Sequence, residues 1–493
     1  MILTNDSRLS QLLDGVLSQA PADQPVYLVG GAVRDLRLDR PVHDLDFVVP
    51  NQVRSFARRV ANALGGDFYM LDEGRSSARV IVHAADGGQT FLDFCILRGP
   101  DLESDLRDRD FTVNAIAFDL RQPDVWIDPT GGIADLQAGV LRACSAQSFQ
   151  NDPVRVLRGV RLAQGLEFRL LPETLDAMHP VVVRLPKISA ERRRDEFLRI
   201  LEGRNVRTAL RLLDDLDVLR TILPELIPLK GMTQSAPHIY DGWEHTLAVL
   251  AELERVWAGL VEGQALAADP FMAAAAQRLR RYRPQLVEHF RVQLNPNRSL
   301  RALLFLAALF HDIAKPQTRT VDPDGRIRFF AHDERGARVA ADCARRMALS
   351  QVEVERVEHI VVHHMRVHLL TMSGELPSRR AIFRYFRDSG LSGVDIVLLS
   401  LADMLATYGD TLSQEAWERE LATARALLEG WFDQSARVVQ PPRLLSGTDL
   451  MNELNLVPGP EVGRLLDLIQ EAQATGEVNS RDEALELARK SLE

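Results

Sequence analysis

The sequence predicts an α/β domain at the N-terminus, followed by domains that are built almost entirely of helices. Residues 23–140 alternate short apolar runs with glycine-rich turns, whereas after about residue 150 the apolar residues recur with helical spacing to the end. At 493 residues the chain is also too long for one ordinary core. We therefore expect several domains, of which the first contains a β-sheet.

The elements of the N-terminal part follow from their patterns. Residues 1–22 predict one short amphipathic helix that ends near Pro21, and residues 53–64 predict another helix. Four apolar runs predict strands, at residues 26–29, 47–49, 79–82 and 91–94. In the helical part, two segments have the composition of linkers, Ser235–Asp241 and Gln440–Thr448.

The composition excludes several classes of protein. With 46% hydrophobic and 26% charged residues, the chain has the balance of a globular protein. Its three scattered cysteines predict no disulfide framework and favour a reducing compartment. No wholly apolar run approaches the ~20 residues that a membrane span needs, and the N-terminus lacks a signal pattern. We therefore expect a cytoplasmic protein without a membrane partner.

The charge distribution is uneven along the chain. The net charge is −10, which is unusual for a protein that binds nucleic acid. Between Arg155 and Arg211, however, 13 Lys and Arg residues stand against 7 Asp and Glu residues. This stretch fits contact with phosphates and a solvated helical face equally well.

The strongest chemical signal lies in residues 26–50. A predicted strand leads to Gly30-Gly31, and a helix is expected to start one or two residues later. Two glycines allow the backbone to approach a triphosphate, and the N–H groups of the following helix point toward it. Asp44 and Asp46 come next, and residues i and i+2 of a strand project to the same face. We therefore expect these two carboxylates to converge.

Asp93, in the apolar run at residues 91–94, offers a third carboxylate from a neighbouring strand. Carboxylates this close repel unless cations lie between them, and paired Mg²⁺ ions also serve in-line phosphoryl transfer. A plain glycine turn explains the glycine pair alone, but not the glycine pair together with the three acids. We predict that Asp44 and Asp46 hold Mg²⁺ and that Asp44, Asp46 and Asp93 are catalytic.

The stretch resembles the nucleotidyltransferase signature of the polymerase-β-like superfamily, and the residues after it are similar to motifs of class II tRNA CCA-adding enzymes and bacterial poly(A) polymerases. Residues 109–115 resemble the family's Arg-Arg-Asp motif, with Asp108 in the place of the first arginine. The resemblance implies that Arg109, Asp110 and Asn114 hold the ribose and the triphosphate. The departure at Asp108 removes one expected phosphate contact. Residues 128–136 are similar to the family's hinge between head and neck.

Residues 150–158 resemble the family's Glu-Asp-x-x-Arg motif, with Asn151 in the place of the glutamate. The carboxylate of Asp152 can accept from the amino group of cytosine or adenine, while the Arg155 guanidinium donates to the ring acceptor beside it. Uracil and guanine present the reverse pattern and are rejected. Asp152-Pro153 is also an ordinary helix start, and both interpretations can hold together. Residues 191–196 match the last family motif, an ion network that braces the neck.

The nucleotide-binding residues that the resemblance implies are Gly30, Gly31, Arg34, Arg109, Asp110, Asn114, Asp152, Arg155 and Arg158.

A second group of histidines and aspartates resembles the HD superfamily. It comprises His245, His311-Asp312, His332, His363-His364 and Asp403. Imidazole and carboxylate ligands suit Zn²⁺, Mn²⁺, Ni²⁺ or Mg²⁺. An apolar helical run presents His311-Asp312 at its end, and Lys315-Pro316 is expected to stop that helix.

Within the histidine pair, His364 fits the family position better than His363. We predict a second divalent metal ion in this domain, held by His245, His311, Asp312, His364 and Asp403. An intact set implies a phosphohydrolase that acts on 2′,3′-cyclic phosphates or nucleotide ends. The alternative is a body that docks tRNA and keeps relic histidines.

Together these features predict an α/β nucleotidyltransferase (polymerase-β-like) head, an all-α neck, an HD-type body and a helical tail. The expected boundaries are 1–140 for the head, 141–235 for the neck with its nucleotide-selecting motif, 236–410 for the HD-type domain and 411–493 for the tail. The tail resembles the module that binds the outer part of tRNA, and Thr448-Asp449 has the chemistry of a helix start.

The function that the resemblance implies is template-independent addition of CMP and AMP, from CTP and ATP, to the 3′ end of tRNA. Poly(A) addition is an alternative that the HD-type residues disfavour. From another class, an HD phosphohydrolase with a nucleotide-binding N-terminal module stays open, and the sequence leaves the oligomeric state open.

The segment Gly99–Asp108 bears on which nucleotides are added. At ten residues it is short for the mobile loop of the family's full CCA-adding members, which favours an enzyme that adds only the two cytidines. The alternative is that another segment, such as Asp72–Ser77, supplies the same lever.

Overall fold

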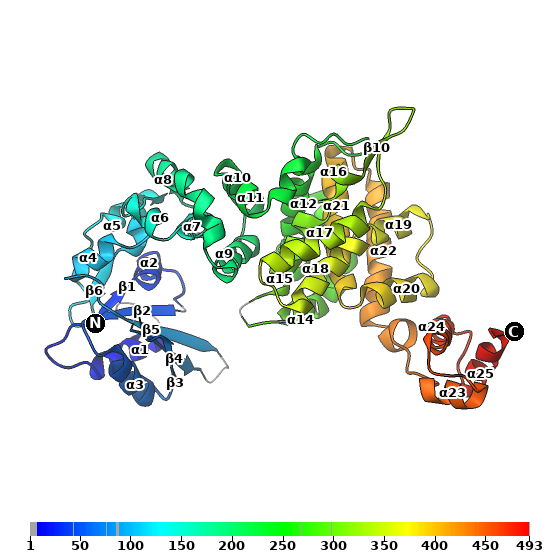
Figure 1. Cartoon of the computed structure of the whole chain (residues 1–493), viewed down its shortest axis with the longest axis horizontal. Helices are drawn as coiled ribbons and strands as arrows, with labels where there is room; N and C mark the ends of the chain where they lie inside the picture. Colours follow the sequence, from blue (N-terminus) through cyan, green and yellow to red (C-terminus); the bar gives the residue numbers. More distant parts are fainter. Residues whose placement is uncertain are drawn as a thin grey trace. The chain divides into compact units, whose positions relative to one another are not determined.

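The computed structural model describes residues 7–42, 44–74, 76–84, 88–266, 268–296 and 298–492. The chain forms two compact units, Met1–Ile188 and Ser189–Glu493. Figure 1 shows that the first contains a sheet with helices around it and that the second is almost entirely helical. This confirms the predicted fold class. The finer boundaries of head, neck, HD-type body and tail stay predictions.

The sheet of the first unit has seven strands in the order β3-β4-β5-β2-β1-β6-β7. The strands are β1 (Tyr27–Val29), β2 (Asp44–Val49), β3 (Asp67–Asp72), β4 (Ser77–His83), β5 (Gln89–Ile96), β6 (Ala117–Asp119) and β7 (Trp126–Ile127). All neighbouring strands are antiparallel except β2 and β5, which are parallel. The predicted strands are present. The edge strand β3 and the short strands β6 and β7 were not predicted, and the side chains of β3 are mostly exposed.

Helices surround the sheet and continue beyond it in the same unit. They are α1 (Ser7–Ser18), α2 (Gly31–Arg37), α3 (Val53–Leu64), α4 (Leu102–Arg107), α5 (Gly132–Ala138), α6 (Gln147–Asn151), α7 (Arg155–Leu166) and α8 (Pro172–Met178), with the 3₁₀ segments Thr112–Asn114 and His179–Lys187. A short parallel pair, β8 (Val140–Leu141) and β9 (Arg169–Leu170), lies among them. The predicted helix at residues 53–64 has those bounds, whereas residues 1–6 of the predicted N-terminal helix lie outside the described residues.

One face of the sheet is covered by α3. The ring of Phe56 on α3 packs edge-on against Phe94, and Phe94 stacks on Phe47 at 5.0 Å between centroids. Because side chains alternate along a strand, the residues next to these phenylalanines on β2 and β5 point to the opposite face. The predicted carboxylates therefore lie on the face away from α3.

The second unit begins with helices α9 (Ala190–Glu202), α10 (Val206–Asp215), α11 (Val218–Ile222), α12 (Gly242–Trp257), α13 (Pro270–Leu279), α14 (Arg283–Arg291), α15 (Leu300–Phe310) and α16 (Lys315–Thr318). A hairpin of β10 (Arg319–Val321) and β11 (Ile327–Phe329) comes next. The remaining helices are α17 (His332–Arg346), α18 (Gln351–His363), α19 (Arg366–Met372), α20 (Arg379–Ser389), α21 (Ser392–Tyr408), α22 (Gln414–Phe432), α23 (Gly447–Leu454), α24 (Pro460–Thr475) and α25 (Arg481–Lys490).

One predicted helix boundary was wrong, and another was shifted by one residue. Lys315-Pro316 does not stop a helix, since α15 ends at Phe310 and Pro316 stands in the first turn of α16, where a proline is tolerated. Helix α23 starts at Gly447, before Thr448-Asp449. Its cap is Ser446, whose hydroxyl and backbone bond reciprocally with Asp449.

Helix α21 forms the centre of the second unit. It is buried along most of its length and packs against α12, α18 and α22. The stretch Ser392–Thr411 is long and apolar enough to meet the length and composition of a membrane span, but 83% of it is buried inside the unit. That burial is typical of a core helix.

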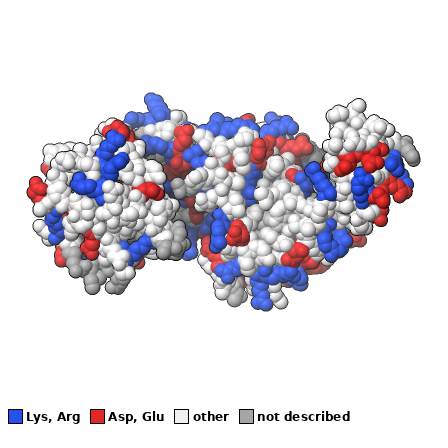
Figure 2. Space-filling view, turned by 90° about the horizontal axis from the view of Figure 1, so that it is seen from below, with Lys and Arg blue, Asp and Glu red and all other residues white. Residues whose placement is uncertain are grey.

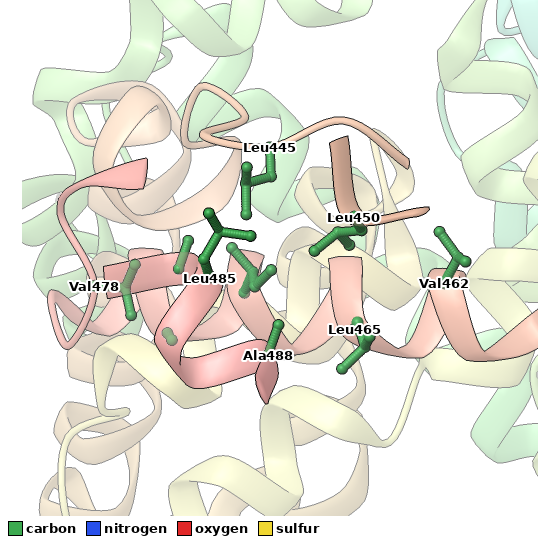
Figure 3. Packing of buried hydrophobic residues seen from close by; sticks show 10 residues of the cluster. Leu445, Leu450, Val462, Leu465, Val478, Leu485 and Ala488 are labelled. Carbon is green, nitrogen blue, oxygen red and sulfur yellow. The ribbon is translucent and has the colours of Figure 1, made fainter. Parts of the chain in front are cut away.

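The C-terminal helices have an apolar core of their own. Figure 3 shows Leu450 of α23, Leu465 of α24 and Leu485 of α25 converging. The rest of this cluster comprises Leu445, Val462, Ile469, Ala472, Val478, Ala484 and Ala488. These helices are joined to α20 by ion pairs, in which Glu471 contacts both Arg380 (3.1 Å) and Arg384 (2.6 Å).

Such pairing is visible on the surface. On the face shown in Figure 2, Lys and Arg side chains lie beside Asp and Glu side chains within each unit. The net charge of −10 therefore does not produce one acidic face in this view.

Candidate functional sites

The three predicted catalytic carboxylates lie together on the open face of the sheet. In the parallel register of β2 and β5, Asp46 lies opposite Asp93. Asp44 shares the face of Asp46, while Leu45 between them is fully buried on the other face. The i, i+2 spacing brings two acids together, and the strand pairing adds the third.

These carboxylates crowd one another. Burial raises the pKa of Asp46, and the negative charges of Asp93 and Asp44 raise it further, while Arg109 and Arg158 act in the opposite direction. A carboxylate that is buried beside like charges is stabilised by a bound cation, and oxygen ligands are those that Mg²⁺ prefers. The donor set therefore fits a divalent cation.

The glycine turn lies directly against this site. Gly30 has φ 77°, a conformation that glycine adopts without strain, and α2 starts at the next residue. A Cβ atom added at Gly30 would lie 3.1 Å from Asp46 Oδ2 and 3.1 Å from Arg109 Nη1. The turn thus brings bare backbone to the edge of the carboxylates, where any larger side chain would intrude.

An arginine that the sequence did not single out holds the third acid. Arg79 on β4 lies opposite Asp93 across the antiparallel pair β4–β5. Its Nε and Nη2 donate to Asp93 Oδ1 and Oδ2, each at 2.7 Å. Both oxygens of Asp93 are thereby engaged in a bidentate pair.

The predicted ribose and triphosphate residues form a connected network. Arg34 Nη1 donates to Asn114 Oδ1 at 2.8 Å, and Asn114 Nδ2 donates to Asp110 Oδ1 at 3.1 Å. Arg158 Nε lies 2.9 Å from Asp110 Oδ2. Although burial opposes it, Arg158 and the hydrogen bond from Asn114 lower the pKa of Asp110. Asp110 is therefore an ionised hub that orients the side chains around it.

Arg109 lies apart from that network. Its Nη2 is 3.3 Å from Asp105 Oδ2, and its Nη1 faces Gly30. This position, between the glycine turn and the acids, is suited to a phosphate contact.

The predicted base-selecting residues lie at the start of α7. Arg155 Nη1 donates to the main-chain carbonyls of Asp108 (3.1 Å) and Ser148 (3.2 Å). Asp152 Oδ1 accepts a hydrogen bond from Val154 N at 3.4 Å. Asp152 therefore lies three residues before α7, which starts at Arg155. The two departures from the family pattern contact each other, because Asn151 Nδ2 donates to Asp108 Oδ1 at 3.2 Å.

In the second unit, five elements bring the HD-type residues together. They are His245 on α12, His311 and Asp312 after α15, His332 at the start of α17, His364 after α18 and Asp403 on α21. Two triads have ligand atoms within 4.8 Å of one another, and both contain Asp312. One adds His245 and His311, and the other adds His332 and His364. Asp403 Oδ1 lies 3.1 Å from His245 Nε2.

Three of these histidines share one arrangement. His311 Nδ1 lies 2.7 Å from the carbonyl of Ala308, and His364 Nδ1 lies 2.7 Å from that of Val361. His332 Nδ1 is likewise 2.8 Å from a main-chain carbonyl. A ring that donates through Nδ1 leaves the Nε2 lone pair for a metal ion. His363 belongs to neither triad among the described residues, so the geometry agrees with the preference for His364.

The buried atoms of this cluster are poorly satisfied. His245 Nε2, His311 Nε2 and Asp312 Oδ2 are buried and make no well-formed hydrogen bond within the described part of the chain. Lys315 Nζ, which the sequence did not single out, lies 2.6 Å from Asp312 Oδ2 as an ion pair. Buried polar atoms that have ion-pair neighbours but no well-formed hydrogen bond are costly unless a ligand completes them. The donor set therefore fits a transition-metal ion.

The charge states also suit a metal. Burial, together with the neighbouring His332 and His311, lowers the pKa of His364 to about 3, and burial lowers that of His238 to about 4. Although burial opposes it, His311 and Lys315 keep the pKa of Asp312 well below its ordinary value. Neutral imidazole and ionised carboxylate are the forms that bind metals. Although burial opposes it, Asp312 raises the pKa of His311, so a metal ion bound there would displace a proton.

A cavity of about 220 Å³ opens beside these residues. Asp312, His332, His364 and Asp403 lie in its wall. Its other residues include Lys315, His238, His368, Ser400, Phe329, Met365, Met404 and Tyr408.

Comparison with known proteins identifies the families to which both units are similar. The models of four families match: the poly(A) polymerase head domain at residues 26–142, the RNA- and SrmB-binding site of polymerase A at 167–229, the HD domain at 275–407, and domain 2 of tRNA nucleotidyltransferases at 419–488. A CC-adding tRNA nucleotidyltransferase of Thermus thermophilus is 34% identical over 92% of this chain and 91% of its own length. The chain belongs to the tRNA nucleotidyltransferase/poly(A) polymerase family.

Other members of the tRNA nucleotidyltransferase family have different names. An A-adding enzyme of Deinococcus radiodurans is also 34% identical, over 93% of both chains. Among solved structures, a CCA-adding enzyme in complex with ATP has a TM-score of 0.60 at 22% identity and covers 100% of this chain and 97% of that one. The CCA-adding enzyme of Thermotoga maritima, complexed with tRNA, has a TM-score of 0.57 at 21% identity. These structures share the fold.

Proposed function

We propose that this nucleotidyltransferase adds nucleotides to the 3′ end of tRNA, and that its main products are the two cytidines from CTP. The carrying observation is the convergence of Asp44, Asp46 and Asp93 on one open sheet face beside the Gly30 turn. Relatives that span more than nine-tenths of the chain, and that are named for adding C or A to tRNA, support the substrate class.

The residues divide the reaction between them. Asp44 and Asp46 would hold Mg²⁺, which neutralises the triphosphate charge and favours attack of the tRNA 3′-OH on the α-phosphate. Pyrophosphate leaves, and no covalent enzyme intermediate is needed. Arg109 and the network around Asp110 would position the triphosphate and the ribose, so that catalysis is largely positioning and charge neutralisation.

Base selection falls to Asp152 and Arg155. The two carbonyls that accept from Arg155 fix its Nη1 and leave the rest of the guanidinium to donate to a base edge. Asp152, held by Val154 N, presents a carboxylate for an exocyclic amino group. Cytosine and adenine match this pair, whereas uracil and guanine would leave its polar groups unpaired.

The segment Gly99–Asp108 supports a preference for C. Six of its ten residues form α4, which is capped by Asp101 through a 2.8 Å hydrogen bond from Ser104 N. Leu106 is fully buried in a cluster with Val29 and Val48. An anchored helix of this kind has little freedom to reshape the nucleotide site between CTP and ATP. The turn at Asp72–Ser77 is the remaining candidate lever, and its Arg75 lies outside the described residues.

Two tRNA substrates test the proposal, one that lacks all three terminal nucleotides and one that already ends in CC. Each is incubated with CTP, with ATP and with both, and the product length and terminal nucleotide are determined. We expect rapid addition of two cytidines to the first substrate and slow or no addition of A to the second. Rapid A addition to the CC-ending tRNA, without C addition to the other, would establish an A-adding enzyme instead. The same assays on Asp46→Ala test whether the carboxylates are needed, and Asp124→Ala, which replaces an exposed aspartate of the same unit, is the matched control.

A second function is favoured by the unsatisfied buried atoms of the HD-type cluster. The residues that would hold a divalent metal ion are His245, His311, Asp312, His364 and Asp403, with His332 completing the second triad. A metal ion bound there supplies Lewis-acid chemistry for hydrolysis of a phosphate ester. The cavity beside it is large enough for one small phosphate ester.

Elemental analysis of the purified protein tests the metal site. We expect a transition metal in the wild type, a large loss in His311→Ala, and full retention in His363→Ala, the neighbouring histidine outside both triads. Equal metal content in wild type and His311→Ala, or none in either, would leave this region as a scaffold. We propose that the helical tail binds the outer part of tRNA and that the enzyme acts in the cytoplasm.

A further inference from the structure

A buried glutamate stands behind the cavity of the HD-type domain. Glu420 on α22 has no exposed surface, and its Oε1 accepts from the Ser400 hydroxyl. Its other oxygen, Oε2, is buried and makes no well-formed hydrogen bond among the described residues. Burial raises the pKa of Glu420, although the hydroxyls of Ser400 and Thr371 and the nearby imidazole act in the other direction. The burial of Glu420 Oε2 is therefore not compensated by a well-formed hydrogen bond.

That oxygen faces a histidine of the cavity wall. His368 Nδ1 on α19 lies 4.0 Å from Glu420 Oε2, which is an ion-pair distance and about 1 Å longer than a hydrogen bond. The His368 side chain is 30% exposed and, like Ser400, lines the cavity that the metal residues share. Because the two ring nitrogens lie on opposite sides of the imidazole, Nε2 lies on the side away from Glu420.

The same unit shows what a purely structural buried glutamate looks like. Glu353 is equally buried, and both of its oxygens are engaged by Arg298, at 2.5 and 3.1 Å. Glu420 instead has one oxygen without a well-formed hydrogen bond, and its neighbour His368 lines the cavity. A carboxylate behind a histidine orients the ring and stabilises its protonated form, which is the arrangement that acid–base catalysis uses.

We propose that His368, oriented by Glu420, donates the proton to the leaving oxygen when a phosphate ester is hydrolysed in this cavity. The step rests on the hydrolytic function proposed above. The oxygen of water forms a bond to phosphorus, the bond between phosphorus and the ester oxygen breaks, and that oxygen takes the proton from His368 Nε2. The proton released by the attacking water passes to solvent, from which His368 is protonated again, so the net reaction is ester and water to phosphate and alcohol.

This arrangement selects a class of substrate. An alkoxide is a poor leaving group and needs a proton, whereas a nitrophenolate or a phosphate leaves without one. The ligand is therefore an ester of an aliphatic alcohol, such as a sugar hydroxyl. At about 220 Å³ the cavity is below the roughly 300–1,000 Å³ of ordinary ligand pockets, so it favours a small phosphate ester.

The test compares two substrates with the full-length, metal-loaded protein: 2′,3′-cyclic AMP, whose leaving group is a ribose hydroxyl, and bis(4-nitrophenyl) phosphate, whose leaving group needs no acid. We expect His368→Ala to lower kcat on the cyclic nucleotide by about 100-fold or more, and on the nitrophenyl ester only several-fold. Glu420→Gln should lower the first rate by about tenfold. Metal content should stay unchanged in both variants and in the control His363→Ala.

The outcomes separate the two proposals. Equal losses on both substrates, or no loss on either, would overturn the role of His368, whereas hydrolysis by the wild type would still support the metal site. Failure of the metal-loaded wild type to hydrolyse either substrate would overturn the hydrolytic function, and His368 with it. If His368→Ala is not folded by circular dichroism, His368→Gln retains the shape of the ring without its acidity and gives the same comparison.

Discussion

The two candidate sites gather their residues in opposite ways. In the first unit, Asp44, Asp46 and Asp93 come from two paired strands and lie on an open sheet face, where arginines balance them. In the second unit, five separate elements supply imidazoles and carboxylates that are buried and make few well-formed hydrogen bonds. The first site suits large, charged substrates that enter and leave with their Mg²⁺ ions, whereas the second suits a resident metal ion and a small ester.

The comparison implies that the two sites can be inactivated independently. Asp46→Ala should lower nucleotide addition by at least about 100-fold, because a metal carboxylate contributes several kcal/mol to transition-state stabilisation. The metal content of the HD-type domain should not change. Incorporation of labelled CTP into tRNA and elemental analysis of the same preparation measure both. More than a few per cent of residual activity in both Asp44→Ala and Asp46→Ala would remove these residues from the metal site.

Arg79 tests how Asp93 takes part in the open site. The Arg79 guanidinium positions Asp93 and at the same time occupies both carboxylate oxygens that a cation would use. Arg79→Ala should therefore lower kcat by about tenfold and shift the Mg²⁺ dependence of the rate to lower concentration. Arg79→Lys, which keeps the charge but loses the bidentate geometry, should fall between the two. An unchanged rate and an unchanged Mg²⁺ titration would show that the pair has no part in catalysis.

Base selection gives a smaller effect. Arg155→Ala should relax discrimination against UTP and GTP by about tenfold and weaken triphosphate binding less, because only contacts to the base edge are lost. Competition between the four nucleotides at a fixed tRNA concentration measures the ratio. If the affinity for all four falls equally, Arg155 is a phosphate ligand and base selection lies elsewhere.

The smallest effect concerns the scaffold of the buried site. Although burial opposes it, hydrogen bonds from Arg298 and Ser350 lower the pKa of Glu353. Because the folded pKa is below the unfolded value, the stabilisation is present above about pH 4.5 and is lost as the pH falls through the folded pKa. Glu353→Gln should lower the unfolding free energy by about 1–3 kcal/mol at pH 7 and less at pH 4. Thermal melts of this variant against Glu355→Gln, an exposed neighbour, measure the difference. The same loss at both pH values would contradict the assignment.

How much was predictable differs between the two sites for a physical reason. The pairing of Asp44 with Asp46 follows from strand geometry within three residues, so a short motif sufficed. The register that places Asp93 opposite Asp46, and Arg79 opposite Asp93, depends on how strands far apart in sequence align, which the pattern does not specify. Arg79 was therefore missed although Asp93 was predicted.

In the second unit, residue type was enough to predict the metal ligands but not the residues around them. Histidines next to apolar helical runs indicate a metal site, whereas Lys315 and Glu420 cannot be distinguished in the sequence from exposed charged residues. A glutamate in the middle of a helix is solvent-exposed in most proteins, so the complete burial of Glu420 required the packing of α22 against α21 to become visible. The parallel pairing of β2 with β5 and the anchoring of α4 were hidden for the same reason.

The hydrogen bond between Asn151 and Asp108 has a consequence for how the sequence can change. Each of these residues departs from the family pattern, and in the fold they are one hydrogen-bonded pair, so a change at one position removes the partner of the other. A glutamate at position 151 would face the carboxylate of Asp108 and disturb the loop whose carbonyl accepts from Arg155. The family's arginine at position 108 would restore the balance only together with that glutamate. The side chains at positions 108 and 151 therefore have to be exchanged together if a favourable contact is to be kept.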